Sequence, residues 1–142
     1  MEPVWITGMG LITSIGNERS TVLKSLRTMK HGIERPEMLQ GQESPVKVAG
    51  TVKEFDLDSS DPEDWVYPEQ YSVPRSTLRS FSPHVLYSWC AIQQAISDAK
   101  ISDDELKDPD SGLYTSSGGS MRSIHKHFEK MDRKGVMACN PL

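Results

Sequence analysis

The sequence is poor in cysteine, in aromatic residues and in long apolar runs. It has 2 cysteines and 7% aromatic residues among 142 residues. Cys90 and Cys139 form no CxxC motif, so no disulfide framework is indicated. No apolar run approaches the roughly 18 residues that a membrane span requires. The first residues, Met-Glu-Pro, lack the positive region of a signal peptide. We therefore expect a cytoplasmic protein without a membrane-spanning segment.

Basic residues are also fewer than acidic ones. The chain carries 16 lysines and arginines against 20 acidic residues, which gives a net charge of −4. This balance argues against a protein dedicated to binding nucleic acid or an anionic membrane, so any basic site must be local. With 36% hydrophobic residues, a chain of this length can bury a core without metals or disulfides. One globular unit is the expected organisation.

Alternating strand and helix signals predict an α/β layered fold. Val4-Trp5-Ile6-Thr7 is a short apolar run ending at glycine, which is typical of a buried strand that enters a tight turn. Asn17 can cap a helix that Gly32 would end, and Ser82-Pro83 is a strong start for a long helix to Ala99. Further elements are expected as strands at 46–52 and 112–115, a short helical turn at 102–106 and a final helix to about residue 134.

The long helix is expected to bury one face. Its apolar residues recur every three or four positions. They are Val85, Trp89, Ile92, Ile96 and Ala99, and the face is widened by Leu86, Cys90 and Ala95.

A glycine motif follows the first expected strand. Gly8-x-Gly10 invites a dinucleotide-binding interpretation, but Thr13 stands where that fingerprint needs a third glycine. The pattern therefore favours glycines that serve the backbone geometry of a tight turn. No cofactor site is predicted from it.

Two other patterns could suggest metal ligands. Asp56-x-Asp58-x-x-Asp61 has aspartate at the position where a calcium loop needs glycine, which favours a solvated acidic loop. His125 and His127 diverge by about 200° on a helix, so they cannot share one metal ion. We predict no metal site.

The cysteines give no sign of a nucleophile. Cys90 lies on the apolar face of the long helix, where a thiol is usually a small buried hydrophobe. Cys139 is followed by Asn140-Pro141, and nothing there resembles a nucleophile turn. Neither residue is assigned a catalytic role.

The final helix has two stripes of opposite character. Met121, Ile124, Phe128 and Met131 form an apolar stripe, and Arg122, Lys126, Lys130 and Arg133 form a basic one. We expect the first to pack and the second to face solvent. The basic stripe is either an ordinary solvated face or a dock for an acidic partner.

Several motifs together resemble the β-ketoacyl-acyl carrier protein synthases. Residues 4–17 are similar to the N-terminal signature of that family, and the similarity extends along essentially the whole chain. It is closest to the type I elongating synthases. The further motifs, in the family's order, are Leu23-x-x-Leu26 with His31-Gly32-Ile33, Ala49-Gly50-x-Val52-Lys53, residues 91–99, and Gly112-Leu113 through Ser117-Gly118-Gly119-Ser120.

The resemblance implies a thiolase-like layered αβαβα fold, of which residues 1–142 are an incomplete N-terminal part that stops before the nucleophile turn. The family condenses an acyl thioester with malonyl-acyl carrier protein in the elongation of fatty acids or related polyketides, and it works as homodimers. Its nucleophilic cysteine, two histidines and a lysine would lie beyond residue 142. The resemblance thus implies an acyltransferase whose chemistry this chain alone lacks, with no cofactor except the phosphopantetheine that the carrier protein brings.

The resemblance also implies binding residues. Gly118, Gly119 and Ser120 would border the acyl chain, and Leu142 would approach the partner subunit's pocket. The residues expected to dock the acyl carrier protein are Arg75, Arg79, Lys130, Arg133 and Lys134. An alternative is a non-catalytic, synthase-derived module that pairs with the carrier protein or with a full-length synthase.

Overall fold

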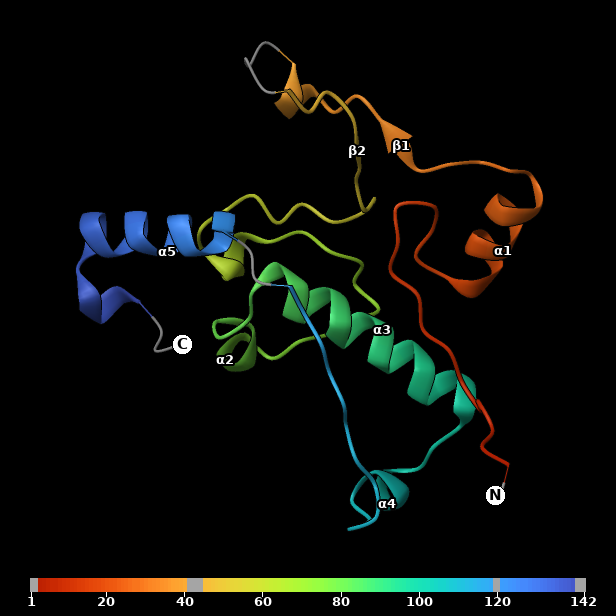
Figure 1. Ribbon diagram of the computed structural model, residues 1–142. Coiled ribbons are helices and arrows are strands. Elements are labelled where there is room, and N and C mark those ends of the chain that lie inside the picture. The colour runs from red at the N-terminus through yellow and green to blue at the C-terminus, as the bar shows by residue number, and fades with distance from the viewer. Residues whose placement is uncertain (1–2, 41–44, 119–120, 140–142) are drawn as a thin grey trace. The chain divides into compact units, whose positions relative to one another are not determined.

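The computed structural model describes residues 3–40, 45–118 and 121–139 (Figure 1). The chain divides into two compact units, which are Met1–Glu54 with Cys90–Lys100 and Phe55–Trp89 with Ile101–Leu142. The long helix α3 (Pro83–Ala99) contributes residues to both. The first unit also contains α1 (Arg19–Arg27), β1 (Ile33–Glu34), the 3-10 helix η1 (Glu37–Leu39) and β2 (Ala49–Gly50). The second contains η2 (Pro62–Asp64), α2 (Arg75–Leu78), α4 (Asp103–Leu106), α5 (Met121–Lys134) and η3 (Val136–Ala138).

Helix α1 confirms the first expected helix but not its ends. Glu18, and not Asn17, occupies the N-cap position. The Asn17 amide nitrogen donates to the carbonyl oxygen of Lys53 at 2.7 Å, while its Oδ1, the atom that would cap, accepts no hydrogen bond from the helix. The helix ends before Gly32 because Met29 adopts a left-handed φ of 52°. Gly32 has another role, since a Cβ there would lie 2.3 Å from the Ser14 hydroxyl oxygen.

The strand content is smaller than the sequence predicts. β1 and β2 pair antiparallel, with Ile33 opposite Gly50 and Glu34 opposite Ala49, so β2 covers two residues of the expected strand 46–52. The predictions of strands at 4–7 and 112–115 are wrong for this structure. Val4 is 96% exposed and Tyr114 is 97% exposed. A strand that is apolar on both faces needs paired neighbours and covering layers, and the described residues of its own unit supply neither.

The core of the second unit gathers around η2, α2 and the first half of α3. Its buried apolar side chains are Trp65, Tyr71, Val73, Leu78 and Leu86. The Trp65 indole nitrogen donates to the Ser59 carbonyl oxygen at 3.0 Å, and the rings of Phe55 and Tyr87 meet edge to face at 5.2 Å. This packing fixes the segment that carries η2 against α2.

Helix α3 spans the residues that the sequence predicts, but its buried face is rotated. Leu86 and Cys90 are fully buried, whereas Val85 is 43% exposed. The two residues assigned to the margin of the apolar stripe are therefore at its centre. Periodicity identifies the stripe, while the position of neighbouring segments decides which line of residues faces inward.

The short helix α4 confirms the expected turn at 102–106. The Ser102 hydroxyl accepts from the Glu105 backbone N–H, and the Ser102 backbone N–H donates to the Glu105 carboxylate at 2.8 Å. This reciprocal arrangement is a capping box. The backbone and side-chain hydrogen bonds from Ser102 hold the pKa of Glu105 below its usual value.

Within the part of the chain that the structure describes, no helix combines the length and the apolar character needed to cross a bilayer.

Candidate functional site

The glycine motif lies directly against α3 in the first unit, where the N-terminal segment runs alongside the second half of the helix (Figure 1). A Cβ on Gly10 would lie 1.7 Å from the Ala91 carbonyl oxygen, and one on Gly8 would lie 2.3 Å from that of Ala95. The glycines with positive φ are Gly16 and Gly135 among the described residues, so Gly8 and Gly10 do not serve a left-handed turn. They allow the backbone of one segment to approach the helix, which corrects the turn-geometry interpretation.

Two side chains of α3 bind the backbone of the same segment. Gln94 accepts from the Leu11 N–H at 3.0 Å and donates to the Asn17 carbonyl oxygen at 2.6 Å. Asp98 accepts from the Met9 N–H at 3.0 Å and lies 3.6 Å from the Arg19 guanidinium. These groups satisfy backbone atoms that a neighbouring strand would otherwise pair. Sequence analysis missed both, because it expected a strand at 4–7 and a tight turn after it, and local patterns do not show which distant side chains bind such a turn.

Neither cysteine has the surroundings of a catalytic thiol. Burial raises the pKa of Cys90 to about 11, so its thiol stays protonated at neutral pH. Cys139 is half-buried, and its Sγ lies 3.9 Å from the His127 carbonyl oxygen. Among the described residues, no group of three His, Cys, Asp or Glu side chains is placed to hold a metal ion.

The structure brings two of the predicted docking residues together. Arg75 begins α2 and Arg79 follows its last residue, so the two arginines lie about one helical turn apart. Both guanidinium groups meet the carboxylate of Glu63 on η2: Arg79 Nε donates to Glu63 Oε1, and Arg75 Nη1 lies 3.9 Å from Glu63 Oε2. Sequence analysis did not single out Glu63, which follows the aspartates of the expected acidic loop. The Asp61-Pro62 pair, a cap followed by proline, was the available sign that Glu63 begins an ordered turn.

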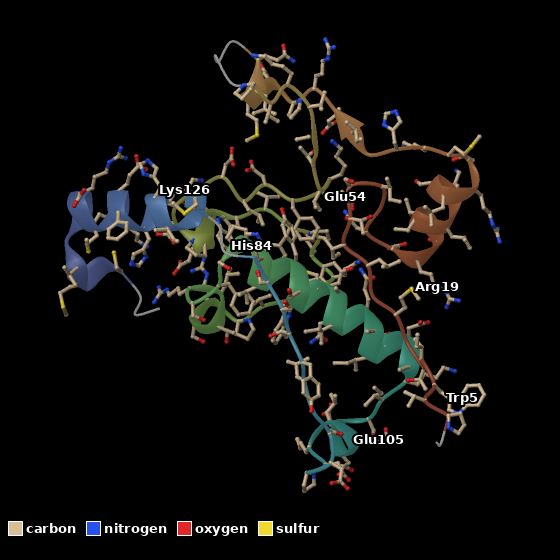
Figure 2. The ribbon with its side chains drawn as sticks, in the orientation of Figure 1. Trp5, Arg19, Glu54, His84, Glu105 and Lys126 are labelled. Atoms are coloured by element: carbon tan, nitrogen blue, oxygen red, sulfur yellow. The ribbon has the colours of Figure 1, made fainter. Side chains whose placement is uncertain are left out.

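The other predicted docking residues lie near the end of α5. Arg133 and Lys134 are exposed in its last turn, and Lys130 is half-buried. Lys126, labelled in Figure 2, donates to the Asp58 carbonyl oxygen. This hydrogen bond connects α5 to the loop that leads into η2. Lys126, expected to face solvent, therefore contacts the loop.

The apolar stripe of α5 does not pack as the sequence predicts. Met121 is 79% exposed and Phe128 is 54% exposed, while Lys126 and Lys130 are half-buried. The expected orientation of the helix is therefore wrong in this structure. Ile124 is also 45% exposed and Met131 of the same stripe is half-buried, whereas Lys126 has the polar loop at Asp58 to bind.

The predicted acyl-binding residues are only partly described. A Cβ on Gly118 would meet no atom within 4 Å among the described residues, so this position is open. Gly119, Ser120 and Leu142 lie outside the described residues. The assignment of these four residues stays a prediction.

Comparisons with known proteins identify relatives along the whole chain. The family model for the "Beta-ketoacyl synthase, N-terminal domain" matches residues 1–141. The chain is 30% identical over 141 residues to 3-oxoacyl-[acyl-carrier-protein] synthase 1 of Haemophilus influenzae, covering 96% of this chain and 31% of that protein. It is 33% identical over 120 residues to the synthase of the same name in Escherichia coli strain K12, covering 84% and 26%. It is 26% identical over 140 residues to 3-oxoacyl-[acyl-carrier-protein] synthase 2 of Synechocystis, covering 98% and 31%. The chain thus spans less than a third of the length of these relatives.

Proposed function

Because the chain belongs to the β-ketoacyl synthase family, we propose that residues 1–142 are the N-terminal part of a condensing enzyme that extends an acyl chain on an acyl carrier protein. The observation that carries this proposal is the family match over residues 1–141. The reaction joins an acyl thioester to malonyl-acyl carrier protein with loss of carbon dioxide, in the synthesis of fatty acids or related polyketides. Synthase names in both the type 1 and type 2 relatives support the fatty acid assignment.

The proposed fold of the whole enzyme is the thiolase-like layered αβαβα arrangement. Two exposed extended segments support it. Val4, Trp5 and Ile6 are at least 79% exposed, and Leu113 and Tyr114 are at least 72% exposed. Apolar segments of this kind are stable in a sheet that is covered on both sides. We propose that residues 1–142 acquire those layers from the remaining two-thirds of the enzyme and from a homodimeric partner.

In this proposal the nucleophilic cysteine does not lie within residues 1–142. An acyl-transferring thiol must ionise at neutral pH, and the raised pKa of Cys90, about 11, opposes this. We propose that the cysteine, two histidines and a lysine of the active site come from sequence after residue 142. Gly118, Gly119, Ser120 and Leu142 would contribute to the acyl pocket, and the phosphopantetheine arm would arrive with the carrier protein. The proposed compartment is the cytoplasm.

The proposed partner surface lies in the second unit. Acyl carrier proteins are acidic, and the net charge of −4 makes a local basic site necessary for binding one. Bases from α2 and from the end of α5 supply it, all of them exposed except the half-buried Lys130: Arg75, Arg79, Lys130, Arg133 and Lys134. Each exposed ion pair contributes only about 0.2–1 kcal/mol, so several must act together.

Charge reversal at this surface should weaken carrier binding. For Arg79→Glu with Lys134→Glu, we expect a Kd for acyl carrier protein about tenfold higher at low salt, with a flatter dependence on ionic strength. Binding of purified holo carrier protein to the 142-residue chain can be followed by isothermal titration calorimetry.

A matched pair controls for net charge. Arg27→Glu with Lys30→Glu reverses two exposed bases of the first unit, giving the same change in net charge. We expect less than a twofold effect from it, because exposed charges outside the proposed surface act on the carrier only through a field that salt screens. Equal losses from the two pairs would show that net charge, and not this surface, governs binding.

A further inference from the structure

The two arginines of α2 already bind a carboxylate of their own unit. Glu63 Oε1 accepts from Arg79 Nε, and Glu63 Oε2 lies 3.9 Å from Arg75 Nη1. The Glu63 side chain is 25% exposed, whereas those of Arg75 and Arg79 are 81% and 62% exposed. The carboxylate therefore lies beneath two guanidinium groups that still face solvent.

Both sides of this cluster are held in place by buried neighbours. On the η2 side, Asp61 caps the turn by accepting from the Glu63 N–H at 3.2 Å. Pro62 and Trp65, which lie before and after Glu63 in the sequence, are buried. On the other side, α2 is anchored by the buried Leu78. Because both turns are anchored, the contact forms without ordering any backbone, and only side-chain freedom opposes it.

The cluster reproduces the contact that an acidic partner would make. A guanidinium binds a carboxylate through its planar N–H groups, and Glu63 uses the Nε edge of Arg79 for this purpose. Two positive charges and one negative charge leave the cluster with a net charge of +1, so an approaching carboxylate meets about half the attraction that the arginines alone would offer.

From this geometry we infer that Glu63 is an internal competitor for the acidic partner: it occupies Arg75 and Arg79 in the free protein and limits their affinity for carboxylates of the carrier. The inference rests on the proposed docking of an acyl carrier protein at these arginines. A competitor of this kind favours rapid release, which suits a partner that must leave after delivering each substrate.

Neutralising Glu63 should therefore strengthen carrier binding. Glu63→Gln keeps the size of the side chain and an acceptor oxygen, so the turn is preserved. We expect the Kd for holo acyl carrier protein to fall about two- to fivefold at low salt, with a steeper dependence on ionic strength. Glu69→Gln removes the same charge at an exposed site of the same unit and is expected to change the Kd by less than 1.5-fold, roughly the effect of one screened charge.

A second measurement tests the displacement directly in the unaltered chain. The Arg79 Nε–H resonance reports its contact with Glu63, so we expect it to shift when the carrier protein is added. An Nε–H signal that stays in place while the carrier binds would overturn the inference, and so would a Glu63→Gln variant that binds equally or more weakly. If the unaltered chain does not bind the carrier at all, the proposed docking fails and this inference fails with it.

Discussion

Replacing Gly10 with alanine is expected to destabilise the packing of the first unit by about 3 kcal/mol or more, because the added Cβ has no room. It would lie 1.7 Å from the Ala91 carbonyl oxygen and 2.7 Å from the Ala91 carbonyl carbon. Both are backbone atoms of α3, so no side-chain rotation relieves the clash. Either the N-terminal segment leaves the helix or the helix shifts as a whole.

Unfolding in urea, followed by circular dichroism, measures this loss. Amide hydrogen exchange localises it, since the Met9 and Leu11 N–H groups are protected by Asp98 and Gln94. Gly118→Ala is the matched control, because a Cβ there meets nothing within 4 Å of the described structure. We expect the control to remain within about 0.5 kcal/mol of the parent. Equal stability of the two variants would refute the close approach of Gly10 to α3.

Replacing Gln94 with leucine is expected to lower the free energy of unfolding by about 2–3 kcal/mol. The side chain accepts from Leu11 N–H and donates to the Asn17 carbonyl oxygen, and leucine can do neither. A donor and an acceptor would lose their partners in a partly buried place, and each such loss costs about 1–3 kcal/mol. Because the volume hardly changes, the loss measures hydrogen bonding more than packing.

The neighbouring Gln93 provides the control for this substitution. It is exposed on the same helix, so Gln93→Leu makes the same chemical change away from the segment. We expect only Gln94→Leu to lower the urea midpoint and to release the Leu11 amide for exchange. Similar midpoints for the two variants would mean that Gln94 does not hold the segment.

The helices could be predicted because their signals are local. The Ser102 capping box, the proline that starts α3 and the extent of α5 each depend on residues within a few positions of one another. The ends of α1 could not be predicted in the same way. Asn17 has the chemistry of a cap, but its amide nitrogen binds Lys53, distant in sequence, and the helix takes Glu18 as its N-cap.

The strands and the faces depend on partners that local patterns do not contain. Val4-Trp5-Ile6-Thr7 has the composition of a central strand, yet the described structure binds the following residues through α3 side chains. Helical periodicity predicts the apolar and the basic stripe of α5. Which stripe faces inward depends on the segments that pack against the helix, and periodicity does not identify those segments. The role of Glu63 could not be predicted for a similar reason. Its carboxylate meets Arg79 only because α2 packs against η2, and local sequence does not show that packing.

The central claim is that these residues belong to a carrier-dependent condensing enzyme whose acyl-accepting cysteine lies elsewhere. The most direct test is the intact mass of the 142-residue chain after incubation with an acyl-[acyl carrier protein] at pH 7.5. At a pKa of about 11 the thiolate fraction of Cys90 is below about 0.1%, and we expect no acyl adduct and no condensation product although the carrier binds. A stoichiometric acyl thioester on Cys90 or Cys139 would contradict this account.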